Sequence, residues 1–223
     1  IECPAVAVTN AFNTVLYTGD ATARSITTVG FKPDFVWMKN RNSTQWHGLY
    51  DSVRGAGKWI TSNATNAEAD TAGTTLTSFN TDGFSLGNDS NGYGANTNNN
   101  TYVAWNWKAG GADVLNQEGT MDSQVSANVD AGFSIVTNKT SNSENTVGHG
   151  LNAAPELILS KPLSNGVYQW SCWANGFSGY QGIELSTSNA RYTNGGFRTV
   201  YSTSTTTMGF GLQFLSATNY GAN

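Results

Sequence analysis

The stretch Pro33-Asp34-Phe35-Val36-Trp37-Met38-Lys39 recurs in altered form as Pro155-Glu156-Leu157-Ile158-Leu159-Ser160-Lys161. In both places a proline and an acid precede a short apolar run that ends at a lysine. Short apolar runs bounded by proline and polar residues are typical of strands covered on both faces. We therefore expect residues 35–38 and 157–159 to be core strands of two related units.

The segments around this stretch keep the same order. Val15-Leu16-Tyr17-Thr18 before the first stretch corresponds to Ser134-Ile135-Val136-Thr137 before the second, and Phe84-Ser85-Leu86-Gly87 after it corresponds to Met208-Gly209-Phe210-Gly211. The spacing between matching positions is that of a small domain and is much longer than a solenoid repeat. The pattern predicts two tandem copies: residues 1–111, which include an N-terminal strand, and residues 112–223.

The two copies differ at their ends. The first closes with Tyr102-Val103-Ala104-Trp105-Asn106-Trp107, which is apolar on both sides of its pleat. The counterpart of this strand would fall after Asn223, so we expect the second copy to lack its last strand and to expose unpaired backbone groups. Two segments remain open as occupants: the apolar N-terminal Ala5-Val6-Ala7-Val8 of another chain, and a continuation of this polypeptide.

Composition supports an all-β fold. Of the 223 residues 38% are hydrophobic and only 12% are charged, while Gly, Ser, Thr and Asn are abundant. This balance favours short strands and turns over helices. Runs that are apolar on both faces favour a sandwich over an open sheet, so the prediction is two tandem antiparallel β-sandwich domains of the jelly-roll type.

Charge and hydropathy exclude two classes of partner. The net charge is -4, and the 11 Lys and Arg residues are scattered without forming a basic stripe. This argues against nucleic acid. No apolar run approaches the roughly 20 residues that a bilayer requires, so we expect no membrane insertion.

The residues offer little for catalysis. The two histidines, His47 and His149, lie in unrelated contexts and are expected in turns or at the surface. There is no nucleophile elbow, and no His-x-x-x-His or Cys-x-x-Cys spacing. Glu68-Ala69-Asp70 is the one Glu-x-Asp pair that a glycosidase would suggest, and its polar surroundings favour solvated loop charges. We expect no enzyme activity and no cofactor.

Two further features bear on metal binding and on disulfide formation: an oxygen-rich loop and the two cysteines. Asp82, Asn88, Asp89 and Asn91 have the oxygen ligands that Ca²⁺ prefers, but Asn, Asp and Gly in this order also make turns. We favour turns and expect no metal. Cys3 and Cys172 either form one bridge or remain two thiols.

The aromatic residues fall into two groups. Trp37, Trp105 and Trp107 lie in the apolar runs and are expected in the core. A second group stands beside Gly, Ser and Asn, where loops would expose it to stack on sugar rings, although partial burial between the copies remains an alternative. These candidate ligand-binding residues are Trp46, Trp59, Trp170, Trp173 and Tyr180.

Several motifs carry a family resemblance: Gly-Phe-x-Pro-Asp-Phe-Val-Trp-x-Lys-Asn-Arg (residues 30–41), and the segments 51–56, 76–84 and 102–111. Residues 131–136 and 147–151 also match the second unit of the family, and the match is looser after Pro162. They resemble a tandem domain of unassigned function found in virion and tail-fibre proteins of tailed bacteriophages, many of them marine. The resemblance implies a concanavalin-like β-sandwich in a structural or adhesion protein at the surface of the virion. The implied partners are copies of itself, other virion proteins and host-surface carbohydrate. It implies no defined chemistry.

Two functions from different classes follow. The first is a self-assembling virion structural and adhesion protein, such as part of a tail fibre. The alternative is a free carbohydrate-binding module of a secreted protein. Oligomeric state separates them, because a virion part forms a symmetric multimer with large subunit contacts and a free module is a monomer.

Overall fold

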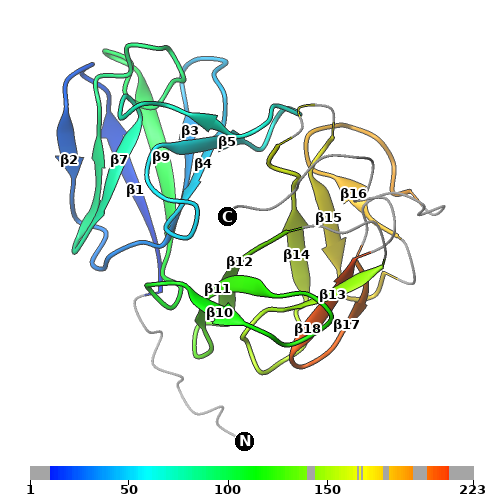
Figure 1. Ribbon diagram of the computed structural model, residues 1–223. Helices are drawn as coiled ribbons and strands as arrows, with labels where there is room; N and C mark the ends of the chain where they lie inside the picture. The colour runs from blue at the N-terminus through cyan, green and yellow to red at the C-terminus, as the bar shows by residue number, and fades with distance from the viewer. Residues whose placement is uncertain are drawn as a thin grey trace, which may run out of the picture.

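The computed structural model (Figure 1) describes residues 11–139, 144–164, 166, 168–177, 181–192 and 200–210. Throughout these residues the chain is all-β, with antiparallel strands and no helix, as the composition predicts. It follows that the described segments contain no helix long and apolar enough to cross a membrane. The strands are β1 Phe12–Thr18, β2 Arg24–Ile26, β3 Phe35–Asn40, β4 Gly48–Asp51, β5 Lys58–Thr61, β6 Ala69–Asp70, β7 Leu76–Asn80, β8 Gly83–Leu86, β9 Thr101–Trp107, β10 Val114–Asn116, β11 Ser123–Asn128, β12 Phe133–Asn138, β13 Asn145–Gly148, β14 Leu157–Ser160, β15 Ser171–Ala174, β16 Ile183–Glu184, β17 Val200–Thr203 and β18 Thr207–Phe210.

Residues 11–111, here called the first unit, form two sheets with the strand orders β1-β9-β3-β4-β5-β6 and β2-β8-β7. Alternate residues of a strand point to opposite faces. Val36 and Met38 of β3 and Ala104 of β9 therefore point the same way and pack against Phe84 and Leu86 of the second sheet. The core between the two sheets makes this part of the chain a sandwich-type fold.

The second unit is residues 112–210, and its described residues form three three-stranded sheets: β10-β11-β12, β13-β18-β17 and β14-β15-β16. Their shared core contains Val147 of β13, Ile158 of β14, Trp173 of β15, Val200 of β17 and Met208 of β18. Figure 1 shows the two units as two groups of strands beside each other.

The strand orders of the two units correspond. The order β2-β8-β7 in the first unit matches β13-β18-β17 in the second, and β3-β4-β5 matches β14-β15-β16. These pairs include the segments that repeat in sequence. One position differs: β9 lies between β1 and β3, whereas among the described residues β12 pairs with β11 alone and β14 with β15 alone. The division into two copies of one domain stays a prediction that this correspondence supports.

The outer face of β3 and β9 corrects one expectation. Trp37, Trp105 and Trp107 are only half-buried and lie on the face opposite the sandwich core. Trp37 instead packs in a cluster with Trp170 and Leu159 of the second unit, and the ring of Trp107 lies 6.1 Å from that of Phe133 on β12. The strands are apolar on both faces because the second unit covers the outer one.

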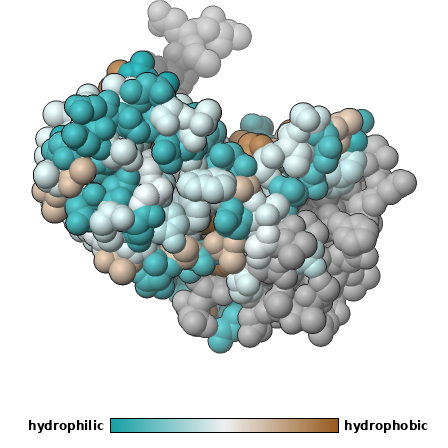
Figure 2. All heavy atoms as spheres, turned by 90° about the horizontal axis from the view of Figure 1, so that it is seen from above, coloured by the Kyte–Doolittle hydropathy of each residue, from teal (hydrophilic) through white to brown (hydrophobic). Residues whose placement is uncertain are grey.

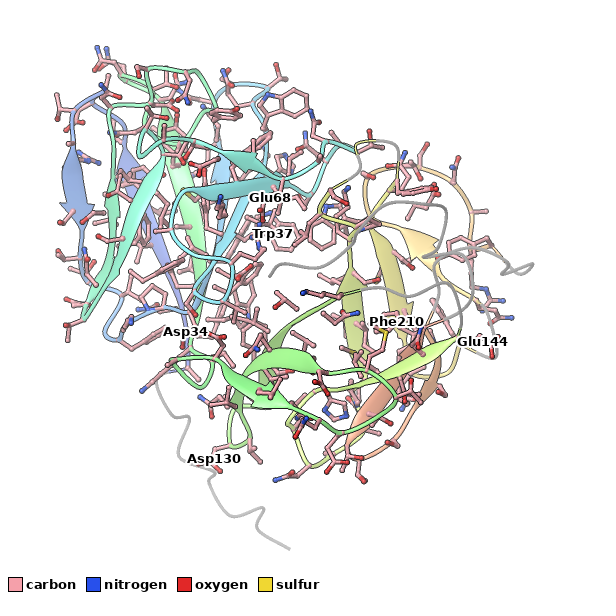
Figure 3. All side chains as sticks on the ribbon, in the orientation of Figure 1. Asp34, Trp37, Glu68, Asp130, Glu144 and Phe210 are labelled. Carbon is pink, nitrogen blue, oxygen red and sulfur yellow. The ribbon has the colours of Figure 1, made fainter. Side chains whose placement is uncertain are left out.

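Asp34, which is 2% exposed, holds the segment that connects β9 to the second unit. Its Oδ2 accepts hydrogen bonds from the backbone N–H groups of Ala109 (2.9 Å) and Gly111 (3.3 Å). Between them, a Cβ on Gly110 would come within 2.4 Å of the carbonyl oxygen of Ala127, so this close approach requires glycine. Figure 3 labels Asp34 where the two units meet.

Candidate functional site

Trp46, in the segment between β3 and β4, is 40% exposed. Its ring lies edge-on to that of Trp59 on β5, with the centroids 6.2 Å apart and the planes at 80°. The ring of Trp59 is buried and lies 4.6 Å from that of Tyr93. An edge-to-face pair of this kind stabilises by about 0.5–1.5 kcal/mol beyond burial. Trp46 is therefore an exposed indole on a packed aromatic base, and we call these three residues the Trp46 platform.

Local hydrogen bonds hold the backbone next to Trp46. The N–H of His47 donates to Oδ1 of Asn63 (2.9 Å), and the N–H of Ser62 donates to the carbonyl oxygen of His47 (3.1 Å). A Cβ on Gly48 would lie 3.2 Å from Nε1 of Trp59. This glycine lets the start of β4 approach the aromatic base closely.

Two neutral polar side chains, those of Gln45 and His47, flank Trp46 along the chain. The side chain of Gln45 packs against Gly94, where a Cβ would lie 2.9 Å from Oε1. Burial, followed by the charge of Lys39, lowers the pKa of His47 below its ordinary value, so its imidazole is neutral at pH 7. A flat apolar ring bordered by amide and imidazole groups can stack on a sugar ring and hydrogen-bond its hydroxyls.

Of the other candidates, Trp59 is the base of the platform, and Trp170 and Trp173 lie elsewhere. Trp59, Trp170 and Trp173 are buried, so the expectation that loops expose them is wrong. Trp170 lies between the units, where its Nε1 donates to the carbonyl oxygen of Thr61 (2.7 Å). Trp173 lies in the core of the second unit. Tyr180 falls outside the described residues.

Glu68 and Asp70, the two acids that were expected to be solvated loop charges, also differ from each other in burial. Asp70 is exposed and pairs with Lys58 at 3.0 Å. Glu68, however, is partly buried, with its side chain 22% exposed, and its Oε2 accepts from Nη1 of the buried Arg54 at 3.0 Å. Arg54 Nε also donates to Oδ2 of Asp51 at 2.5 Å. The guanidinium occupies the space between the two carboxylates, where the reacting bond of a glycosidase substrate would have to lie. The network therefore ties β4, the segment after it and the segment before β6 together through one guanidinium.

In the oxygen-rich loops the carboxylates of Asp82 and Asp89 accept hydrogen bonds from backbone N–H groups. Asp82 accepts from the N–H groups of Thr28 (3.1 Å) and Gly30 (2.6 Å). Asp89 accepts from the N–H groups of Gly94 (3.1 Å) and Asn96 (3.3 Å). Within the described ranges no three His, Cys, Asp or Glu side chains gather as a metal site.

His149, expected in a turn or at the surface, lies in the segment that follows β13. It is buried, its Nδ1 accepts from the N–H of Leu151 (3.2 Å), and Nε2 therefore carries the proton and donates to the carbonyl oxygen of Ser204 (3.2 Å). Cys172 is a buried free thiol on β15, and burial raises its pKa. Cys3 lies outside the described residues.

The sequence did not predict a hollow of about 470 Å³ beside β10 and β11. Its lining includes Val114 and Leu115, both exposed, together with Val125 and Glu118. The apolar pair Val114-Leu115 was the one sequence feature that could have indicated this hollow. Two apolar residues in succession are also found in covered strands, so the pair alone does not predict exposure.

The fold and the platform define an all-β sandwich-type protein with an exposed aromatic surface. The chain belongs to the family described as Domain of unknown function (DUF7483), which matches residues 7–223. No curated protein and no solved structure matches the chain.

Proposed function

We propose that this chain is a structural and adhesion protein of a bacteriophage particle and contacts host-surface glycans through the Trp46 platform. The observation that carries the proposal is the exposed indole of Trp46 on the buried ring of Trp59. A ring that is already held in place loses little conformational entropy when a sugar stacks on it. The proposed role is binding without catalysis or cofactor.

Two further features support an adhesive structural role. The face of the first unit shown in Figure 2 is largely hydrophilic, and only 12% of the residues of the chain are charged, so most of its polar groups are neutral, as suits contact with glycans. The second unit exposes large apolar side chains, among them Val114, Leu115 and Ile183, as surfaces that contact other subunits do. The motifs resembling those of tail-fibre proteins favour a virion setting.

Replacing Trp46 with alanine should abolish most glycan binding. Wild-type chain is first applied to an array of bacterial surface glycans, and its best ligand is then measured by calorimetry. We expect Trp46→Ala to weaken binding at least tenfold, about 1.4 kcal/mol, because the stacking face is lost. Trp46→Phe should retain part of the affinity.

The matched control is Leu16→Ala, which truncates another exposed apolar side chain, on β1. This variant should bind glycan as the wild type does. Unchanged binding by Trp46→Ala, or equal losses in both variants, would contradict the proposal. A glycan-binding chain that stays monomeric at high concentration would favour the free carbohydrate-binding module over the virion protein.

A further inference from the structure

His149 links the segment after β13 to the turn between β17 and β18. Its backbone N–H donates to the carbonyl oxygen of Thr206 (3.1 Å), and Nε2 of its ring donates to the carbonyl oxygen of Ser204 (3.2 Å). On the other side of the ring, Nδ1 accepts from the N–H of Leu151 (3.2 Å). The residue is 1% exposed. Both ring nitrogens therefore hold buried backbone groups of the second unit in place.

The residues on either side of this histidine are glycines that approach a second sheet. A Cβ on Gly148 would lie 2.0 Å from Oδ1 of Asn116 on β10. A Cβ on Gly150 would lie 3.0 Å from the Cβ of Ala127 on β11. The hydroxyl of Ser123 also donates to the carbonyl oxygen of Gly148 (3.0 Å). The segment therefore joins the sheet β10-β11-β12 to the sheet β13-β18-β17.

The hydrogen bonds of the ring require the neutral form of His149. A neutral imidazole donates from one nitrogen and accepts at the other, whereas the protonated form only donates. A proton on Nδ1 would point at the N–H of Leu151, so that two donors would face each other and the bond would be lost. The charge of the imidazolium would also be buried, which is costly unless it is paired.

The elements around His149 contain few charges that could pair with an imidazolium. Residues 145–152 and 200–210 contain no Asp, Glu, Lys or Arg. On β10, β11 and the segments beside them the acids are all exposed: Asp113, Glu118, Asp122 and Asp130. Burial lowers the pKa of His149, and the hydrogen bond to the carbonyl oxygen of Ser204 offsets only part of this effect.

The sign of the pH dependence follows from the lowered pKa. A histidine in the unfolded chain takes up a proton as the pH falls through about 6.5, while the folded second unit still excludes it. The stability that neutral His149 contributes is therefore complete above this pH and is lost progressively below it. His47, the second of the two histidines in the chain, lies in the first unit and is half-buried, so it is a control.

We propose that His149 is an acid-sensitive latch of the second unit. Proton uptake at Nδ1 breaks the bond with Leu151, releases the turn between β17 and β18, and loosens the joint between the two sheets. The step is reversible binding of a proton from water and needs no other reactant. The first unit has its own core and keeps its packing. This inference does not depend on glycan binding.

Methyl NMR of the full chain labelled at its three methionines tests the latch. Met208 lies on β18 in the core of the second unit, and Met38 lies in the core of the first. Between pH 7.5 and pH 5 the Met208 resonance should shift or broaden together with the titration of His149, followed at its Cε1. The Met38 resonance should stay constant. Met38→Leu and Met208→Leu assign the two signals.

Two asparagine variants separate the histidines. Asparagine places an oxygen near the position of Nδ1, so His149→Asn can still accept from Leu151 but does not titrate. The urea midpoint of the wild type should be lower at pH 5.5 than at pH 7.5. His149→Asn should lose most of this difference, and His47→Asn should keep most of it. In His149→Gln, a second non-titrating variant, the amide can donate to Ser204 instead.

Several outcomes would overturn the proposal. One is a Met208 resonance that stays constant while His149 titrates, and another is an equal response of Met38. A pKa of His149 at or above that of an ordinary histidine would contradict the buried neutral ring. Full pH dependence in both variants of His149 would assign the effect to another group. The NMR titration uses the wild-type chain, so it gives a result even where a variant does not fold.

Discussion

Replacing Arg54 with methionine should destabilise the protein by about 3–5 kcal/mol, the usual cost of breaking a buried ion pair from one side. The side chain of Arg54 is 5% exposed and that of Asp51 8%. Burial alone would lower the pKa of Arg54, but the charges and hydrogen bonds of Asp51 and Glu68 outweigh it and raise the pKa. The guanidinium also donates to the carbonyl oxygens of Leu49 and Lys58 (3.2 Å each). Methionine fills similar space but removes every guanidinium donor, so that of these bonds the carboxylate of Asp51 keeps only the one from the backbone N–H of residue 54 (2.8 Å).

Urea unfolding of matched variants measures this effect. Lys58→Met removes the exposed ion pair with Asp70 and should cost no more than about 1 kcal/mol. Adding Asp51→Asn and Glu68→Gln to Arg54→Met should restore part of the stability, because the uncompensated charges are gone. A loss below about 1 kcal/mol in Arg54→Met would show that water reaches this network and that it is not a buried anchor.

Gly83→Ala should cost at least about 3 kcal/mol, because two separate strains add. Gly83 begins β8 with φ at +112°, a conformation that residues with a side chain rarely adopt. A Cβ there would also lie 2.0 Å from the carbonyl oxygen of Ile26 on the neighbouring β2. Backbone cannot move aside as a flexible side chain can, so β2 and β8 would have to separate.

Gly92→Ala is the control, since Gly92 has φ at +70° but open space around its Cβ position. It should cost only the backbone strain, about 1–2 kcal/mol. Both free energies come from urea midpoints with the slope compared between variants. Equal losses in the two variants would contradict the close approach of β8 to β2.

The sequence predicted those parts of the fold that depend on local pattern. The apolar run after Pro33 and its echo after Pro155 became β3 and β14. Apolar runs, alternation and flanking turn residues are properties of neighbours along the chain. They therefore predict strands without any knowledge of the tertiary contacts.

Burial of individual side chains was less predictable, because it depends on residues far away in sequence. Trp170 has polar neighbours in sequence, yet it packs against residues of the first unit and bonds Thr61, 109 positions away. Glu68 looked like a loop charge because its partner Arg54 lies 14 positions earlier and is itself buried. Neither contact leaves a periodic signal in a single sequence.

The candidate site was predicted in part. Trp46 was among the five aromatic residues expected to contact ligand, and it alone of the four described is exposed. Its base could not be predicted, because Trp59 and Tyr93 come from β5 and from the segment between β8 and β9, which only the sandwich brings together.

Fluorine NMR of the chain labelled with 5-fluorotryptophan, titrated with its best glycan, tests the central claim most directly. The Trp46 resonance, assigned from the Trp46→Phe variant, should shift with glycan concentration. The resonances of the buried Trp170 and Trp173 should stay in place. Glycan-dependent shifts at Trp170 or Trp173 with none at Trp46, or no shift at any tryptophan, would contradict the account.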